Sequence, residues 1–327
     1  MAFNLDAVLA STLPFINKKF TDNLSTKTPL MLKLKKKGGM YMREGGTVLS
    51  FPVIVGKGIA GSYYGDDVLD VSRPQGLQRL TFDWKQFYSS VSIVGIEEIQ
   101  NAGESQAADL LDGRMKQGEI TTIENFEEML FAAGGGNDGK DWNSLQQLVA
   151  DDPTTGTIGG LSRATYTQLQ NQIYTTAVTA FNTAQAGRNA LTTLWARTVN
   201  GERQPNFITT TVAIWTLYQL SLTTNERFVV TNADKDLTSA GFQNVAFMSA
   251  PVTFSSQCPA SHLYMLRIAP PTSDGGIFLV ISKQRNFKME PFIKARNQDV
   301  RSSLVFTAGE LCTDAPYLNG VATNITG

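Results

Sequence analysis

Residues 47–55 read TVLSFPVIV, residues 77–88 read LQRLTFDWKQFY, and the segment between them is rich in glycine, aspartate and tyrosine. Both stretches combine β-branched and aromatic residues, and Leu80, Phe82 and Trp84 alternate onto one face. The pattern predicts a long two-stranded ribbon, and a proline in the first stretch restricts that strand to an edge. Because isolated two-stranded ribbons are marginal in water, we expect this ribbon to lie on a neighbouring copy of the chain. The sequence therefore points to assembly before it points to chemistry.

A long helical pattern follows the ribbon, from about residue 104 to residue 133. Its apolar positions are Ala107, Leu110, Leu111, Met115, Ile123, Phe126, Leu130 and Phe131. Three consecutive glycines follow its end, whereas two glycines inside it weaken the case for a continuous helix. At 1.5 Å per residue, roughly 29 residues would span roughly 44 Å, which suits a structural spine. The β-branched residues 89–96, between ribbon and helix, are expected to stay extended.

Composition excludes several classes of protein. The chain has 327 residues, of which 42% are hydrophobic, so it can bury a sizeable core as one elaborated domain or as two. Its formal net charge of -1 gives no global attraction to nucleic acid or anionic lipid, and no apolar run approaches the roughly 20 residues of a membrane span. The start lacks the basic and apolar regions of a signal peptide, and the only cysteines, Cys258 and Cys312, lie far apart. We therefore expect a protein made in a reducing cytosol, without a disulfide framework.

Charge is unevenly distributed along the chain. A basic segment comes first, and an acidic segment follows the ribbon. The basic residues are Lys18, Lys19, Lys27, Lys33, Lys35, Lys36, Lys37 and Arg43, and the acidic residues are Glu97, Glu98, Glu104, Asp109, Asp112, Glu119, Glu124, Glu127 and Glu128. Two interpretations stay open: both segments are solvated faces, or the basic segment lies along the acidic helix of another subunit, where complementary charge would set register and partner choice.

The N-terminal residues 1–44 are interpreted as an arm. A short amphipathic helix is predicted at 5–16, followed by a break at Pro29. The basic and glycine-containing residues 35–39 are predicted to be a turn or hinge, not part of the core.

The second half of the chain mixes helices and strands. Helices are predicted at 166–182 and 184–199, and Thr211 is predicted to cap a helix that follows a strand at 205–210. Later strands are predicted at 242–248, 252–254, 263–268, 278–281, 287–293, 300–306 and 317–325. Because these late strands follow a helical region, we expect the chain to return to an earlier sheet.

The residues needed for a metal or catalytic site are scarce. The chain has one histidine, His262, which is predicted to lie in a strand, and it has no cysteine cluster, so neither a zinc site nor an iron site is expected. A catalytic pair needs a base within hydrogen-bond reach of a nucleophile, and the sequence does not arrange one. We therefore expect a structural role for His262, no metal, no cofactor and no enzymatic activity.

Residues 134–141, GGGNDGKD, match the spacing of a phosphate-binding loop through Gly139 and Lys140. However, Asp141 stands where a hydroxyl residue should bind magnesium, and the segment ends a helix instead of following a strand. We interpret it as a loop after a helix, with Trp142 anchoring its far side.

Two further residue groups have bland interpretations. The adjacent carboxylates at 97–98, 127–128 and 151–152 diverge on a helix and do not converge across a cleft, so solvated acidic faces are expected. The aromatic and basic residues at 84–88 could stack on a nucleic acid, but packing of the ribbon against a neighbour is favoured.

The order of these elements resembles a tailed-bacteriophage major capsid protein of the HK97-like fold, an α+β fold. A basic arm leads to a long two-stranded loop, a long spine helix, a glycine-rich break and a mixed α/β region that includes residues 205–222, and late strands then return. The segments at 287–292 and 314–318 are similar to the final strands of that family. The resemblance covers nearly the whole chain and rests on architecture, because the family has no sharp short motif.

The resemblance implies a division of the chain. It consists of an N-terminal arm (1–44), an extended β-hairpin loop that overlaps a neighbouring subunit (45–95), a peripheral domain with the spine helix (96–150 and 276–313), and an axial α/β domain that meets its copies at five-fold and local six-fold axes (151–275 and 314–327). The candidate inter-subunit contact residues are Lys35, Lys36, Lys37, Lys57, Tyr63, Tyr64, Trp84 and Phe87.

The resemblance also implies a function and a set of partners. The chain would assemble with copies of itself, as pentamers and hexamers, into a closed icosahedral shell of a virion that encloses double-stranded DNA without sequence-specific binding. Its other partners would be a portal, a separate scaffold protein and a decoration protein, and it would not bind a membrane. Assembly would take place in the bacterial host cytoplasm. Two alternatives stay open: an encapsulin-like compartment shell that encloses an enzyme, and an unrelated soluble enzyme.

Overall fold

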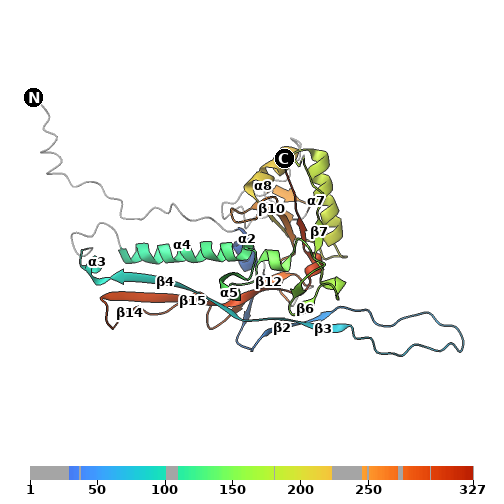
Figure 1. Ribbon diagram of the computed structural model, residues 1–327, viewed down its shortest axis with the longest axis horizontal. Helices are drawn as coiled ribbons and strands as arrows, with labels where there is room; N and C mark the ends of the chain where they lie inside the picture. Colours follow the sequence, from blue (N-terminus) through green and yellow to red (C-terminus); the bar gives the residue numbers. More distant parts are fainter. Residues whose placement is uncertain are drawn as a thin grey trace, which may run out of the picture. The chain divides into compact units, whose positions relative to one another are not determined.

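The computed structural model describes residues 29–36, 38–100, 110–179, 181–222, 245–248, 250–271, 275–294 and 296–326 (Figure 1). These residues fall into two compact units. The smaller unit takes its described residues from Tyr88–Glu124 and Met289–Phe306, and the larger unit takes the others. The helix predicted at 5–16 lies outside the described residues, as does the start of the predicted spine helix. None of the described helices is long and apolar enough to cross a membrane.

The larger unit contains a six-stranded mixed sheet. Its strand order is β7 (Gln172–Tyr174), β16 (Gly320–Ala322), β11 (Leu263–Leu266), β8 (Phe207–Thr210), β10 (Ala250–Phe254) and β9 (Val245–Phe247). The last strand of the chain, β16, lies between β7 and β11, parallel to the first and antiparallel to the second. The predicted return of the late strands to an earlier sheet is therefore confirmed.

Two helices of this unit match their predictions. Helix α7 (Ala184–Thr198) begins after Thr183, and α8 (Val212–Ser221) begins after Thr211. The Thr211 side chain accepts a hydrogen bond from the backbone N–H of Ile214, so the predicted N-cap is confirmed. A buried cluster between these helices and the sheet includes Leu194, Trp215 and Val252.

The helix predicted at 166–182 is wrong. The segment contains a 3-10 turn, η2 (Thr167–Leu169), and the strand β7. Ile173 of β7 pairs with Val321 of β16, a partner more than a hundred residues away that local spacing cannot reveal. Ladder pairing and the β-branched residues of this segment outweigh its helical periodicity.

A second sheet is built around the long strand β15 (Val300–Thr313), which runs through both units. In the larger unit, β15 pairs with β12 (Ile277–Ser282), and β12 pairs in parallel with β1 (Met40–Arg43). In the smaller unit, β15 pairs with β14 (Ile293–Lys294). The short strand β13 (Lys288–Met289) and the strand β4 (Lys85–Val94) also pair with β15.

The end of the predicted arm belongs to the core of the larger unit. Pro29 does not break the chain but begins helix α2 (Pro29–Lys36), where proline is well tolerated because its missing N–H would have no helical partner. Leu30 and Leu34 of α2 are buried in the main hydrophobic cluster. The turn predicted at 35–39 is therefore wrong for Lys35 and Lys36, which are helical, and the chain turns at Gly38 instead.

The predicted ribbon is confirmed, with a correction to what covers it. Strands β2 (Leu49–Ile54) and β3 (Leu77–Phe82) pair antiparallel, with Leu49 opposite Phe82 and Ile54 opposite Leu77. One face of the ribbon is buried in the main cluster of its own chain, and the ring centroids of Phe51 and Phe278 lie 5.0 Å apart. A neighbouring copy is therefore not needed to cover β2 and β3.

The spine helix α4 (Leu110–Phe131) has 22 residues and continues through the glycine at 118. A Cβ at Gly118 would lie 2.6 Å from Cγ2 of the buried Val91, so glycine allows the helix to approach β4 closely. The extended run predicted at 89–96 is wrong at its end, because α3 (Gly95–Gln100) begins there. The backbone N–H of Gly95 donates to the carbonyl oxygen of Asp299, which holds the start of α3 in the smaller unit.

Candidate assembly surfaces

The segment that joins β2 to β3, residues 57–75, is called the ribbon loop below. Every one of its residues is exposed, and Figure 1 shows it as a long connection beyond the ends of both strands. Tyr64 is 89% exposed and Val68 is 99% exposed, with further exposed apolar side chains at Ile59, Tyr63, Leu69 and Val71. Such a concentration of exposed large apolar side chains marks an interaction site.

Local hydrogen bonds shape the ribbon loop. The backbone N–H of Tyr64 donates to the carboxylate of Asp67, and the N–H of Ser72 donates to Asp70, both at 2.9 Å. Hydrogen bonds from the backbone and the side chain of Ser72 hold the pKa of Asp70 below its usual value. The bonds from Tyr64 to Asp67 and from Ser72 to Asp70 form small turns. The described residues outside the ribbon loop make no hydrogen bond to it.

Two glycines mark the boundary between the packed ribbon and its loop. The N–H groups of Val55 and Gly56 both donate to the carbonyl oxygen of Gly76. A Cβ at Gly76 would lie 2.7 Å from the carbonyl oxygen of Gly56, so the two backbones approach more closely than any side chain allows. Burial changes at this point, from a buried Val55 to an exposed Lys57.

The predicted contact residues divide into two groups. Lys57, Tyr63 and Tyr64 are exposed on the ribbon loop, and Lys35 is exposed at the end of α2, whereas Lys37 and the side chain of Lys36 lie outside what the structure describes. Trp84 and Phe87, by contrast, are half-buried within the subunit. The indole N–H of Trp84 donates to the carbonyl oxygen of Gly46 at 2.8 Å, and Phe87 packs edge-on against Phe126. Whether any of the eight contacts another subunit stays a prediction.

A buried carboxylate that sequence reasoning missed lies next to the ribbon. Glu310 of β15 has no exposed surface, and Nζ of Lys85, the first residue of β4, lies 3.4 Å from its Oε2. The backbone N–H groups of Asn143 and Leu311 donate to Oε1 of Glu310. Burial raises the pKa of Glu310 to about 7, although these donors and Lys85 oppose the rise. The only sequence signal for this site is the single glutamate in the sequence of β15, which stands between Gly309 and Leu311.

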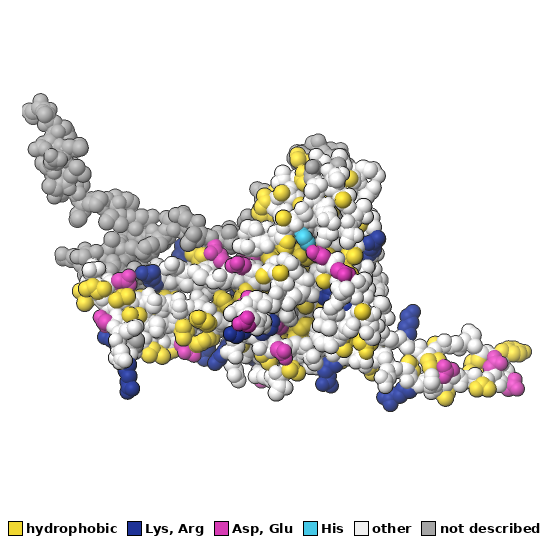
Figure 2. Space-filling view, viewed as in Figure 1, with side chains coloured by type: hydrophobic (Ala, Val, Ile, Leu, Met, Phe, Trp, Pro, Cys, Tyr) yellow, Lys and Arg dark blue, Asp and Glu magenta, His cyan; other side chains and the backbone are white. Residues whose placement is uncertain are grey.

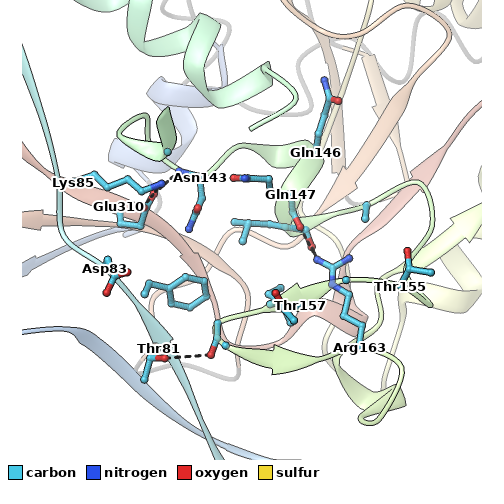
Figure 3. A pocket seen from close by; sticks show the side chains of 18 of the residues that line it. Thr81, Asp83, Lys85, Asn143, Gln146, Gln147, Thr155, Thr157, Arg163 and Glu310 are labelled. Atoms are coloured by element: carbon cyan, nitrogen blue, oxygen red, sulfur yellow. Dashed lines mark hydrogen bonds and ion pairs between the residues drawn. The ribbon is translucent and has the colours of Figure 1, made fainter. Parts of the chain in front are cut away.

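Glu310 and Lys85 lie at one end of an open, largely polar cavity of about 530 Å³ (Figure 3). Arg163 lies at the other end and is only 2% exposed. Its guanidinium donates to the carbonyl oxygens of Gln147 and Leu148 and to the side chain of Asn171. Burial lowers the pKa of Arg163 from its usual value, and no carboxylate among the described residues pairs with it. Its contacts tie three chain segments together, which is a structural role.

Of the expected solvated carboxylate pairs, the pair at 127–128 is only partly solvated and the pair at 151–152 is exposed as predicted. Glu127 is 1% exposed and accepts a hydrogen bond from Oγ of Ser255 at 2.6 Å, so its predicted exposure is wrong. Asp151 and Asp152 are exposed, and Oδ2 of Asp151 lies 3.0 Å from Nε2 of His262. His262 lies just before β11, not inside it, and its other ring nitrogen contacts the carbonyl oxygen of Ala260.

The glycine-rich segment follows the spine helix, as the sequence indicated. Gly134 and Gly135 have positive φ, and the short turn α5 (Gly136–Gly139) follows, in which Asn137 and Asp138 also have positive φ. Trp142 is buried against Phe126, with ring centroids 4.6 Å apart. The predicted anchoring by Trp142 is therefore confirmed. No cluster of three or more potential metal-ligating residues exists among the residues that the structure describes.

The smaller unit has an exposed apolar surface of its own. Val94 at the end of β4, Ile96 and Ile99 of α3, and Ile293 of β14 are all exposed. Figure 2 shows hydrophobic side chains gathered at the left-hand end of the view, where Figure 1 labels α3 and β14. Two contacts hold α3 in place. Arg114 forms an ion pair with Glu97, and the backbone N–H of Gly95 donates to the carbonyl oxygen of Asp299.

The chain was compared with known proteins. No protein-family model matches it, and no curated protein matches it in sequence. Solved structures do match over almost the whole chain. The capsid asymmetric unit of cyanophage A-1(L) aligns with a TM-score of 0.70 at 16% identity, covering 95% of this chain and 96% of that one. The holo-SrpI encapsulin complex of Synechococcus elongatus aligns with a TM-score of 0.60 at 12% identity, covering 100% and 96%.

A third match is the capsid of a native GTA particle, with a TM-score of 0.61 at 10% identity, covering 97% of this chain and 96% of that chain. Because the sequence identities are this low, the matches establish the fold and nothing more. The resemblance drawn from the order of elements is confirmed at that level, and this chain has the α+β fold of the HK97-like capsid proteins.

Proposed function

We propose that this chain is a major capsid protein that assembles with copies of itself, as pentamers and hexamers, into a closed shell around double-stranded DNA. The observation that carries the proposal is the ribbon loop: a long, fully exposed segment with six large apolar side chains, attached to a ribbon that is already packed on its own chain. A single folded subunit gains nothing from displaying this surface, whereas an assembly gains its burial.

The free energy of burying the apolar side chains of the ribbon loop supports assembly of this chain into a shell. Burying one large apolar side chain contributes about 1.5–3 kcal/mol, so partial burial of six such side chains supplies several kcal/mol for each subunit. Many modest contacts of this kind, repeated under closed symmetry, sum into a stable shell. The ribbon loop and the N-terminal residues can dock again as ordering segments when a shell expands.

The finer assignments belong to the same proposal. The working division is an arm (1–44), of which residues 29–36 and 40–43 pack in the larger unit, an extended loop (45–95), a peripheral domain (96–150 and 276–313) and an axial domain (151–275 and 314–327). The partners are copies of the chain, a portal, a separate scaffold protein and a decoration protein. The site of action is the virion, after assembly in the bacterial host cytoplasm. A formal net charge of -1 suits an inner wall that holds DNA without sequence-specific binding.

An encapsulin-like compartment shell is the second candidate, because an encapsulin complex is among the structures that share the fold. Both candidates give the chain a structural role and no catalytic one. They differ in what the shell encloses: packaged DNA in the first case and a protein cargo in the second.

The test is to express the full chain, alone and together with an added scaffold protein, and to image the purified product by negative-stain electron microscopy. Closed shells, or rings of five or six subunits, support the proposal. The contents of shells from infected or producing cells, nuclease-protected DNA or a protein cargo, then decide between the candidates. A product that stays monomeric or dimeric under all these conditions refutes a shell function.

A further inference from the structure

The ribbon loop carries its charges in two groups. Its two cations, Lys57 and Arg73, stand near its ends, whereas its carboxylates, Asp66, Asp67 and Asp70, stand in the middle of the segment. Figure 2 shows the same order, with Lys and Arg side chains near the start of the loop and acidic side chains towards its tip. Both cations are exposed, and neither forms an ion pair or hydrogen bond with any residue that the structure describes.

The cavity beside the ribbon presents the opposite sign to solvent. Five charged residues line it: Asp83, Lys85, Asp152, Arg163 and Glu310. Lys85 is paired with Glu310, and Arg163 is buried behind backbone carbonyl oxygens. The exposed charges on the wall are therefore the carboxylates of Asp83 and Asp152.

These two carboxylates differ in how strongly they are already engaged. Asp152 accepts hydrogen bonds from the N–H and hydroxyl of Thr154 and from the hydroxyl of Thr155, which lower its pKa. Asp83, in the short break between β3 and β4, has no partner among the described residues. Amide side chains of Asn143, Gln146 and Gln147 line the same wall, so a cationic group that enters meets carboxylate and amide oxygens together.

We infer that this cavity is the docking site for the basic ends of the ribbon loop of a second copy of the chain, with Lys57 and Arg73 of one subunit facing Asp83 and Asp152 of the next. This inference rests on the proposed shell function and names the contact that it uses. The volume, about 530 Å³, lies within the range of roughly 300–1,000 Å³ that holds drug-sized ligands, which is room for two long cationic side chains. Complementary charge of this kind fixes register between subunits and disfavours wrong pairings.

The test is a charge exchange in the full chain. A loop variant, Lys57→Glu with Arg73→Glu, and a rim variant, Asp83→Lys, each place like charges together. Each should lower the assembled fraction at low salt by about tenfold or more, because like charges at a contact cost more than one factor of ten in affinity. The combination of all three changes restores opposite charges at position 83, whereas Asp152 still faces a glutamate, so it should recover part of the assembly that the loop variant loses. Neither group packs in the core, so folding, checked by circular dichroism, should be unchanged.

A matched control makes the same charge change elsewhere on the ribbon. Arg79 of β3 is also an exposed cation, but it lies on the part of the ribbon that packs on its own chain. A chain that carries both Arg79→Glu and Asp83→Lys should assemble no better than a chain that carries Arg79→Glu alone. Carbodiimide, which joins an amine to a carboxylate in direct contact, should link Lys57 to Asp83 or Asp152. In assemblies mixed from isotopically labelled and unlabelled subunits, those linked peptides should combine both labels.

The outcomes separate this inference from the proposed function. The docking site is wrong, and the shell function stands, in either of two cases in which the unaltered chain assembles. In the first, the triple variant assembles no better than the loop variant or the rim variant alone. In the second, Lys57 is cross-linked only to peptides that carry the same isotope label. If the unaltered chain fails to assemble at all, the shell function fails and this inference fails with it. Recovery of assembly together with mixed-label links supports the inference.

Discussion

Replacing Glu310 by glutamine should change how the stability of the subunit depends on pH. Glu310 is fully buried, and its pKa is raised from 4.5 to about 7, chiefly by burial. Below pH 4.5 the carboxyl group is protonated in the folded and the unfolded chain alike. Between 4.5 and about 7 the unfolded chain releases the proton and the folded chain keeps it, so the free energy of unfolding falls as pH rises. Above about 7 both states are ionised, and this contribution is constant.

The size of the effect follows from the same two values. The interval from 4.5 to about 7, at 1.36 kcal/mol for each pH unit, corresponds to about 3 kcal/mol. Glutamine carries no titrating proton, and its carbonyl oxygen can still accept the N–H groups of Asn143 and Leu311. Glu310→Gln should therefore gain stability relative to the unaltered chain by up to about 3 kcal/mol as pH rises from 4.5 to 7.

The assay is denaturant unfolding of the unassembled full chain at four or five pH values between 4 and 8, with the variant compared with the unaltered chain at each. Glu44→Gln is the matched control. Glu44 is exposed and pairs with Lys283, and this contact lowers its pKa, so its influence lies below pH 4.5. A stability difference between Glu310→Gln and the unaltered chain that stays constant from pH 4.5 to 7 would refute the reasoning, because it would mean that Glu310 does not hold a proton in the folded state.

Three further changes probe the packing and the ribbon. Gly76→Ala should destabilise the subunit by about 1–3 kcal/mol in thermal unfolding, because its Cβ meets a backbone oxygen at 2.7 Å, whereas Gly61→Ala, with open space around it, should cost under about 0.5 kcal/mol. Leu34→Ala should cost about 2–5 kcal/mol in denaturant unfolding if α2 belongs to the core, and Lys35→Ala beside it almost nothing; equal small effects would return α2 to the arm. Val68→Ala should leave the free energy of unfolding within about 0.5 kcal/mol of its original value and reduce the yield of shells; a change in stability without a change in yield would contradict the role of the ribbon loop.

The elements that the sequence predicted correctly are those whose signal is local. The ribbon follows from two β-branched runs around a glycine-rich segment, and the spine helix follows from apolar spacing that ends at Phe126, Leu130 and Phe131, all of them buried. The cap at Thr211 needs only a hydroxyl residue placed before a helical run. In each case the signal comes from a continuous run of residues or from two runs that follow one another along the chain.

The errors have a common physical cause, which is contact between distant residues. Glu127 reads as one half of a solvated acidic pair until Ser255, 128 positions later, is placed beside it. Ile173 reads as helical until β16 pairs with it. Glu310 lies beyond the strand predicted at 300–306, and its pKa is raised only because the fold buries it, although Lys85 lies beside it and opposes the rise. The cavity that holds this pair could not be predicted at all, because its wall comes from segments between residues 81 and 310.

The ribbon separates folding from assembly at a single point. On one face of the ribbon the apolar side chains are buried on the subunit itself, so changes there should lower the stability of the monomer. These side chains are Leu49, Phe51, Val53, Val55, Leu80 and Phe82. Between Gly56 and Gly76 every residue of the ribbon loop is exposed, so changes there should leave the monomer intact and act only on contacts between copies. A subunit organised in this way can fold first and assemble afterwards, because its contact surface does not have to form for the core to form. It follows that substitutions in the ribbon loop and in β2 or β3 should add independently in monomer stability, and that any coupling between them should appear only in the assembled state.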